Sequence, residues 1–86
     1  MTRELRTGYD MIFELLIQLV DGPKPKTMLM YKTRMNSKQV RYYIGFIVEK
    51  NLVTMKMGKT VAGQKRDLYT LTENGKSFID AANRLR

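Results

Sequence analysis

The charged side chains of this chain are mainly Lys and Arg, and one group of these cations lies on the outer face of a predicted helix. The helix covers residues 37–50, and its buried side is marked by Val40, Tyr43, Ile44, Ile47 and Val48. At about 100° per residue, Lys38, Arg41 and Tyr42 point away from that side, and Gln39 lies on its flank. Lys and Arg donate to guanine or to phosphate, and Gln pairs with adenine. The face is typical of nucleic-acid recognition, although a merely solvated charged face accounts for it equally well.

Further candidate contacts lie just before this helix. A basic connection at residues 23–26, which includes Lys24, leads into a second predicted helix at residues 27–33. The first N–H groups of that helix could hold a phosphate. The candidate DNA-binding residues of this region are Lys26, Thr27, Tyr31, Lys32, Arg34 and Ser37. On the later helix, Gly45 has no side chain to hold the backbone away from a DNA groove.

A basic hairpin is predicted after the helix pair. Strands at residues 52–57 and 65–71 flank a polar tip at residues 58–64, where glycines supply flexibility. Lys59, Lys65 and Arg66 lie at or near this tip with almost no competing acid. A solvated loop would look the same in isolation. Two helices followed by a basic hairpin nevertheless predict a helix-turn-helix with a wing that lies on the DNA backbone or in the minor groove.

The composition restricts the function classes. The 86 residues are enough for a single domain, residues 1–86, whose first six residues we expect to be flexible. Sixteen Lys and Arg against eight Asp and Glu give a net charge of +8, which favours a polyanionic partner. The absence of Cys and His excludes disulfides, the usual zinc sites and His-based catalysis. We therefore expect no enzyme, cofactor, metal or small-molecule ligand.

No stretch is long and apolar enough for a membrane span, and the first ten residues lack the features of a signal peptide. We therefore expect a cytoplasmic, nucleoid-associated protein.

The elements that position these residues follow from apolar periodicity and capping signals. A first helix is predicted from an N-cap at Thr7 to a stop at residues 21–23, with an inward stripe of Tyr9, Ile12, Phe13, Leu16, Ile17 and Val20. In the second helix Leu29, Met30 and Thr33 face inward, and Met35 fills the turn that follows. Asn36 and Gln39 form a predicted capping box for the third helix, and Asn51 is its left-handed cap.

The remaining apolar residues are assigned by the same logic. On the first strand Val53, Met55 and Met57 share a side, and on the second Tyr69 and Leu71 do. Thr72 caps a last helix whose apolar stripe is Phe78, Ile79, Ala82 and Leu85. The seven methionines are predicted to be mostly core filler, and the aromatic residues mostly core. Tyr42 and Phe46 are the predicted exceptions.

Four short segments occur in order along the chain: KTMLMYK at residues 26–32, Asn36 at the head of the third helix, EKNLV at residues 49–53 and LTENGKSF at residues 71–78. Their order and spacing resemble those of the archaeal winged helix-turn-helix proteins related to the Sso10a chromatin proteins. The resemblance implies a mostly α, α+β winged-helix fold in the order α-α-α-β-β-α, binding of double-stranded DNA, and a homodimer. The chain departs from the chromatin-type relatives because its last helix stops at Arg86, before any long coiled coil.

The leading hypothesis is accordingly a transcriptional regulator or chromatin-associated protein that dimerises through its first and last helices. A winged helix used as a protein-interaction module is the alternative, with an exposed apolar patch around Phe46 or on the last helix as its signature. RNA binding is a third possibility, and no aromatic strand pair supports it.

Overall fold

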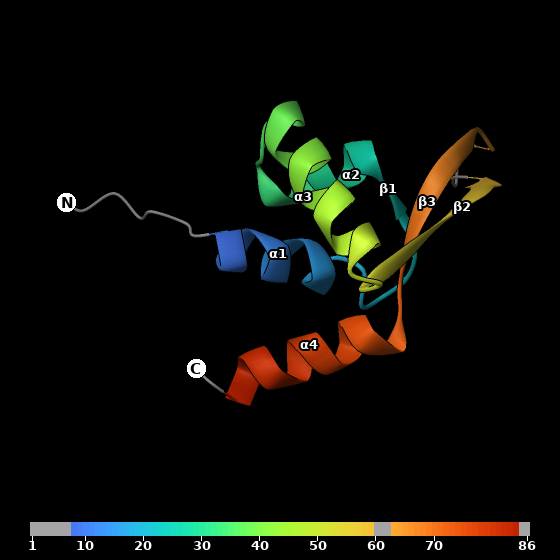
Figure 1. Cartoon of the computed structure of the whole chain (residues 1–86). Coiled ribbons are helices and arrows are strands. Elements are labelled where there is room, and N and C mark those ends of the chain that lie inside the picture. Colours follow the sequence, from blue (N-terminus) through green and yellow to red (C-terminus); the bar gives the residue numbers. More distant parts are fainter. Residues whose placement is uncertain (1–7, 60–62, 85–86) are drawn as a thin grey trace.

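The computed structural model describes residues 8–59 and 63–84. In chain order the elements are α1 (Gly8–Ile17), β1 (Lys24–Pro25), α2 (Lys26–Thr33), α3 (Ser37–Glu49), β2 (Val53–Lys59), β3 (Lys65–Leu71) and α4 (Glu73–Arg84). α1 lies between α3 and α4, and the β2–β3 hairpin projects to one side of the helices (Figure 1). This is the predicted mostly helical winged-helix arrangement with one additional strand. The predicted N-cap Thr7 and the apolar residue Leu85 lie outside the described residues.

The core forms where α1, α2 and α3 meet. Its most deeply buried side chains are Leu15, Leu16, Leu29, Val40, Ile47 and Val53. Each comes from an apolar stripe with a spacing of three or four residues, except Val53 at the base of the hairpin. Met35 and Thr33 are also buried, as predicted, so their side chains connect the turn between α2 and α3 to the core.

The predicted stripe of the first helix is partly wrong. α1 ends at Ile17, and Leu19 and Val20 then donate to main-chain oxygens three residues back rather than four. This tighter winding turns each following residue by a larger angle. As a result Leu19 is buried, whereas Val20 is 61% exposed. At the other end of the helix, Tyr9 is 47% exposed instead of being a core residue.

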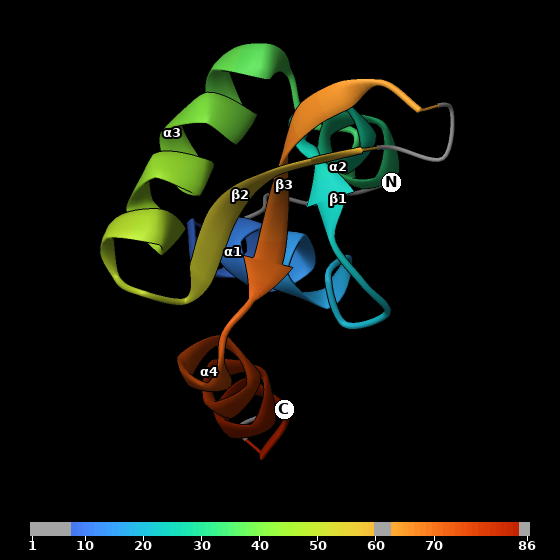
Figure 2. The same cartoon turned by 90° about the vertical axis from the view of Figure 1, so that its right-hand side faces the viewer.

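The connection predicted at residues 23–26 contains the short edge strand β1. Lys24 pairs with Tyr69 and Pro25 with Leu68, which gives an antiparallel sheet in the order β1-β3-β2. Figure 2 shows α3 on one side of the hairpin base and β1 with α2 on the other. Proline is tolerated here because an edge strand has one unpaired side.

Lys24 is therefore not one of the free cations that were expected before the third helix. Its ammonium group donates to the main-chain oxygen of Gln18 at 2.6 Å and forms an ion pair with Asp21. The hydrogen bond and the positive charge of Lys24 lower the pKa of the Asp21 carboxyl group below its ordinary value. The pair fastens the turn after α1 to the start of β1.

α3 begins where the capping signals predicted. The Asn36 side chain accepts from the Gln39 N–H at 2.8 Å, and the Gln39 side chain accepts from the Asn36 N–H at 3.1 Å. After the helix, Asn51 has a φ of 62°, the left-handed conformation predicted for it. The position and direction of α3 are thus fixed at both ends by local chemistry.

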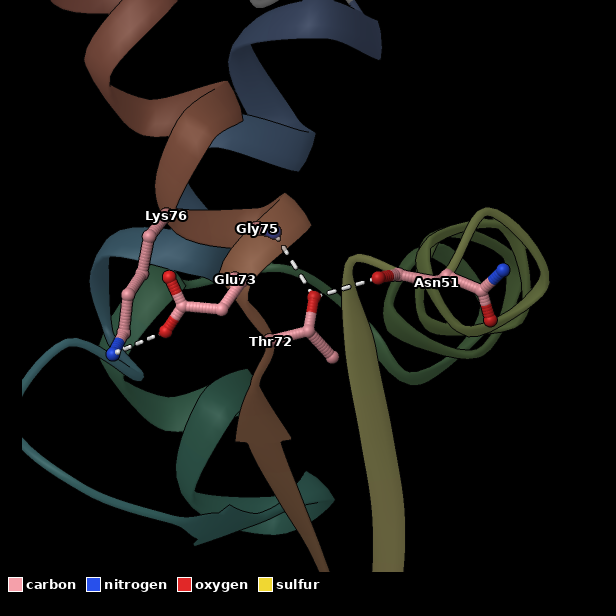
Figure 3. A network of polar contacts seen from close by, with 5 residues as sticks. All are labelled: Asn51, Thr72, Glu73, Gly75 and Lys76. Carbon is pink, nitrogen blue, oxygen red and sulfur yellow. Dashed lines mark hydrogen bonds and ion pairs between the residues drawn. The ribbon is translucent and has the colours of Figure 1, made fainter.

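α4 is anchored to the end of α3 by a polar network (Figure 3). Thr72 caps α4 as predicted, because its hydroxyl oxygen accepts from the Gly75 N–H at 3.0 Å. The same hydroxyl donates to the main-chain oxygen of Asn51 at 2.6 Å. A Cβ at Gly75 would lie 2.3 Å from the main-chain oxygen of Leu52, so only glycine permits this close approach.

The ladder of the hairpin is longer than predicted, and its tip is shorter. Gly58 and Lys59 belong to β2 and pair with Arg66 and Lys65. A Cβ at Gly58 would come within 2.7 Å of the Leu68 side chain. Gly58 therefore makes room for a cross-strand neighbour instead of loosening a loop. No helix within residues 8–59 and 63–84 is long and apolar enough to cross a membrane.

Candidate nucleic-acid interface

The outer face of α3 is organised as its periodicity predicted. Val40, Ile44 and Ile47 are buried, while Ser37, Lys38, Arg41, Tyr42, Gly45 and Glu49 are exposed. Tyr42 is 68% exposed, and its ring meets that of Tyr43 edge-on with centroids 4.9 Å apart. This contact supports the Tyr42 ring from one side, while most of the residue remains exposed to solvent. Two cations and an aromatic hydroxyl thus stand on the first two turns of one helix.

Gln39 has a narrower role than the sequence predicted. Its side-chain oxygen is engaged with the Asn36 N–H in the capping box. A bidentate contact with adenine requires both the oxygen and the NH₂ group of the amide. In this conformation only the NH₂ group is available, so Gln39 positions the start of α3 and can donate to an acceptor.

Packing inside the protein does not explain why residue 45 is a glycine. A Cβ built there would meet no atom within 4 Å. Glycine in the middle of a helix is nevertheless unfavourable relative to alanine by about 1 kcal/mol. The residue therefore weakens α3 without relieving any contact inside the protein, and it leaves the outer face smooth next to Arg41.

A cleft of about 220 Å³ separates the first turn of α2 from β3. It is lined by Pro25, Lys26, Thr27, Arg66, Asp67 and Tyr69. Pro25 occupies the N-cap position of α2 and provides no side-chain cap. The first N–H groups of α2 can therefore donate to an anion. The cleft brings together the predicted contacts Lys26, Thr27 and Arg66, which are far apart in the sequence.

The same cleft contains an acid that the sequence prediction did not consider. Asp67 is exposed at its edge, next to Arg66 in the chain and opposite Met57 in the ladder. Burial raises the pKa of the Tyr69 phenol, and the negative charge of Asp67 raises it further. Only the register of the hairpin places Asp67 here, so its position was not visible from composition.

A second hollow, of about 620 Å³, lies at the other end of α2. It is lined by Met30, Tyr31, Lys32, Arg34, Met35 and Asn36. Tyr31 is 79% exposed, Lys32 and Arg34 are exposed, and Arg34 adopts a left-handed conformation with φ of 60°. The predicted contacts before α3 therefore form two groups, with Lys26 and Thr27 on the first turn of α2 and Tyr31, Lys32 and Arg34 at its other end.

The wing, defined here as β2, β3 and the tip between them, carries four exposed cations. They are Lys56, Lys59, Lys65 and Arg66, of which Lys56 was missed because it falls inside a strand. Lys59 and Lys65 stand directly opposite each other in the ladder. Like charges in this position are destabilising. A phosphate close to both ammonium groups would remove that repulsion.

The prediction that methionines and aromatic residues are mostly core is wrong for several positions. Met28 is 41% exposed, Met55 51% and Met57 69%. On β2 only Val53 reaches the core, because the strand then runs outward beyond the helices. Phe46 is 38% exposed, and the Lys50 ammonium group lies 5.6 Å from the centre of its ring. The apolar surface at Phe46 is therefore shared with a cation.

Comparison with known families settles the fold. A family model described as winged helix-turn-helix matches residues 5–86. The chain belongs to this family. No curated protein matches the sequence.

Several solved structures share the fold at low sequence identity. The protein smu.1704 from Streptococcus mutans UA159 superposes with a TM-score of 0.86 at 8% identity, over 96% of this chain and 81% of that one. A PadR family transcription regulator from Clostridium difficile R20291 gives 0.78 at 16% identity, over 86% and 83%. Sso10a-2, a DNA-binding protein from Sulfolobus solfataricus, gives 0.76 at 19% identity, over 93% and 78%. The expected likeness to Sso10a is thereby confirmed at the level of fold.

Proposed function

We propose that this winged helix-turn-helix chain binds double-stranded DNA as a transcriptional regulator or chromatin-associated protein at the nucleoid. α3 lies in the major groove, and the wing lies on the backbone or in the minor groove. The observation that carries the proposal is the exposed face of α3, where Lys38, Arg41 and Tyr42 precede Gly45, a glycine that packing does not require. The described structural neighbours include a transcription regulator and a DNA-binding protein, which supports the same function.

The energetics of such a complex are mainly electrostatic. Each phosphate neutralised by Lys or Arg releases condensed counterions, so the logarithm of the binding constant falls with the logarithm of salt concentration by about 0.9 per contact. The cations of α2 and the wing supply such contacts. Lys38, Arg41 and Tyr42 face the base edges, and sequence preference arises there.

The experiment is a salt series on a fluorescent mixed-sequence duplex. The parent is compared with the pair of changes Lys38→Ala and Arg41→Ala. The matched control is Lys50→Ala with Arg84→Ala, which removes the same charge from the turn after α3 and from the end of α4. We expect steep salt dependence for the parent and the control, and weaker binding for the α3 variant. A steep slope unchanged in the α3 variant would move the contact to the wing or to α2. Absence of binding at low salt would exclude the function.

We further propose that the DNA-binding form is a homodimer joined through α1 and α4. Tyr9 and Phe78 bring these helices together with ring centroids 5.4 Å apart, yet Tyr9 remains 47% exposed. At the far end of α1, the exposed Val20 borders a groove of about 310 Å³ that also involves Leu71 and Ile79 of the β3–α4 region.

Sedimentation equilibrium tests the dimer. Tyr9→Glu and Val20→Glu place a charge on each of these features and should give a monomer, because a buried unpaired carboxylate is strongly unfavourable. Met28→Glu adds the same charge to α2 and should leave the dimer intact. A monomeric parent, or a dimer that tolerates both Tyr9→Glu and Val20→Glu, would contradict this interface.

A further inference from the structure

The wing carries a row of apolar side chains that phosphate contacts do not use. Val53, Met55 and Met57 alternate along β2 and therefore share one face of the strand. Val53 is buried, but Met55 is 51% exposed and Met57 is 69% exposed. Met55 stands opposite the buried core residue Tyr69, whereas Met57 lies about 13 Å past Val53 and beyond the hydrophobic core. The apolar character of Met57 is therefore not explained by core packing.

The surroundings of this row favour one kind of partner. The hairpin strands carry Lys56, Lys59, Lys65 and Arg66 against the single acid Asp67. The centre of a protein–protein interface is depleted of charged residues, and of lysine in particular. On the face that carries Met55 and Met57, Asp67 stands opposite Met57, and Lys59 and Lys65 follow as a facing pair of cations at the outer end of the ladder. Exposed methionines that lead to such a pair of cations fit a partner with an anionic exterior and an apolar interior. A DNA duplex, with phosphates around stacked bases, has this character.

From these observations we infer that Met57, assisted by Met55, is a wedge that enters the minor groove and opens a base step. The inference rests on the proposed function and specifies how the wing acts. When α3 occupies a major groove, the wing reaches the neighbouring minor groove, which is only about 6 Å wide. An unbranched, polarisable thioether fits such a slot. Apolar wedges of this kind, methionine among them, unstack base pairs and bend the duplex.

A wedge also dictates which sites are bound. Pyrimidine–purine steps such as TA and CA open with the least energy. Sites with one of these steps under the wing should therefore bind more tightly than sites that have a stiff A-tract there. This preference would arise without any hydrogen bond from the wing to a base.

The test measures bending and affinity separately, on a 30-base-pair duplex with a fluorescence donor and acceptor at its ends. The parent, a Met55→Ala and Met57→Ala double variant, a Met57→Leu variant and a Met28→Ala control are compared. We expect the parent to shorten the end-to-end distance and the double variant to lose this change together with about tenfold in affinity. The salt slope should not change, since no charge is lost. Met57→Leu and Met28→Ala should bend DNA like the parent.

Different outcomes separate the wedge from DNA binding itself. Binding without bending by the parent, or equal bending by the double variant, overturns the wedge and leaves the proposed function in place. A parent that binds no duplex overturns both. Thermal unfolding of each variant is measured in parallel. If the alanine changes weaken the hairpin, Met57→Leu is compared with Met57→Thr, because threonine suits a strand but is polar. DNA bending by the Leu variant and none by the Thr variant supports the wedge.

Discussion

Gly45→Ala should stabilise the fold and weaken DNA binding at the same time. Gly45 lies inside the 13-residue helix α3, is exposed, and a Cβ there would meet no atom within 4 Å. The alanine methyl therefore costs nothing in packing and removes the helix penalty of glycine. We expect the free energy of unfolding to rise by about 0.5–1 kcal/mol. For a domain of this size, that corresponds to an increase in Tm of roughly 2–8 °C.

The effect on DNA binding has the opposite sign because of where the methyl points. It projects from the face that carries Lys38, Arg41 and Tyr42. In the proposed complex with DNA, this face is turned toward the floor of the major groove. If the backbone approaches the bases closely, the added carbon forces α3 outward and lengthens its direct contacts. Loss of one good base contact costs about 1–3 kcal/mol, which is roughly 5- to 150-fold in affinity.

Two measurements on one protein sample check this prediction. Thermal unfolding by circular dichroism gives the change in Tm, and fluorescence anisotropy with a duplex gives the change in Kd. Asn83→Ala on the exposed surface of α4 is the matched control, because it raises helix propensity without touching α3. It should stabilise the fold and leave the affinity unchanged. A Gly45→Ala protein that is more stable and binds equally well would refute close approach of the α3 backbone. A less stable one would refute the packing argument.

Three further predictions concern the supporting structure. Gly75→Ala should lower the free energy of unfolding by about 1–3 kcal/mol in chemical denaturation, because its Cβ would overlap the main-chain oxygen of Leu52. Lys65→Ala should raise Tm slightly, since it removes a like-charge pair across the ladder, and should lower the salt slope of DNA binding by about 0.9. Lys24 lowers the pKa of Asp21 in the folded state, so the unfolded chain binds more protons in acid than the folded chain does. The free energy of unfolding should therefore fall below about pH 4, as the pH drops through the lowered pKa. An acid titration of the Asp21→Asn variant should lack this part of the decrease.

The parts of the fold that local chemistry determines were predictable from the sequence. α3 shows this most clearly, because the Asn36–Gln39 capping box, the apolar stripe and the left-handed Asn51 each depend on residues within a few positions of one another. The outward direction of Lys38, Arg41 and Tyr42 follows from the same periodicity. Helical periodicity was therefore enough to identify that part of the candidate site.

Features that depend on long-range pairing were not predictable. β1 has only two residues, and nothing in its Lys-Pro sequence indicates that it pairs with Tyr69 and Leu68. The cleft that joins Lys26 to Arg66 and Asp67 is a consequence of this pairing. Apolar alternation on β2 likewise predicted a shared face but could not show that the strand leaves the core after Val53.

The anchoring of α4 gives the proposed dimer a consequence for DNA recognition. The Thr72 hydroxyl donates to the main-chain oxygen of Asn51 (Figure 3). The Thr72 N–H donates to the main-chain oxygen of Leu52, and Gly75 lies close to that same oxygen just after α3. α4 therefore cannot swing away from α3 without breaking these contacts. In a dimer joined through α1 and α4, the two recognition helices are then held at one separation. Two-fold helix-turn-helix dimers contact half-sites about 34 Å apart, one turn of DNA. A series of duplexes with altered half-site spacing should show one sharp optimum, whereas equal affinity across spacings would mean that the two α3 helices bind independently.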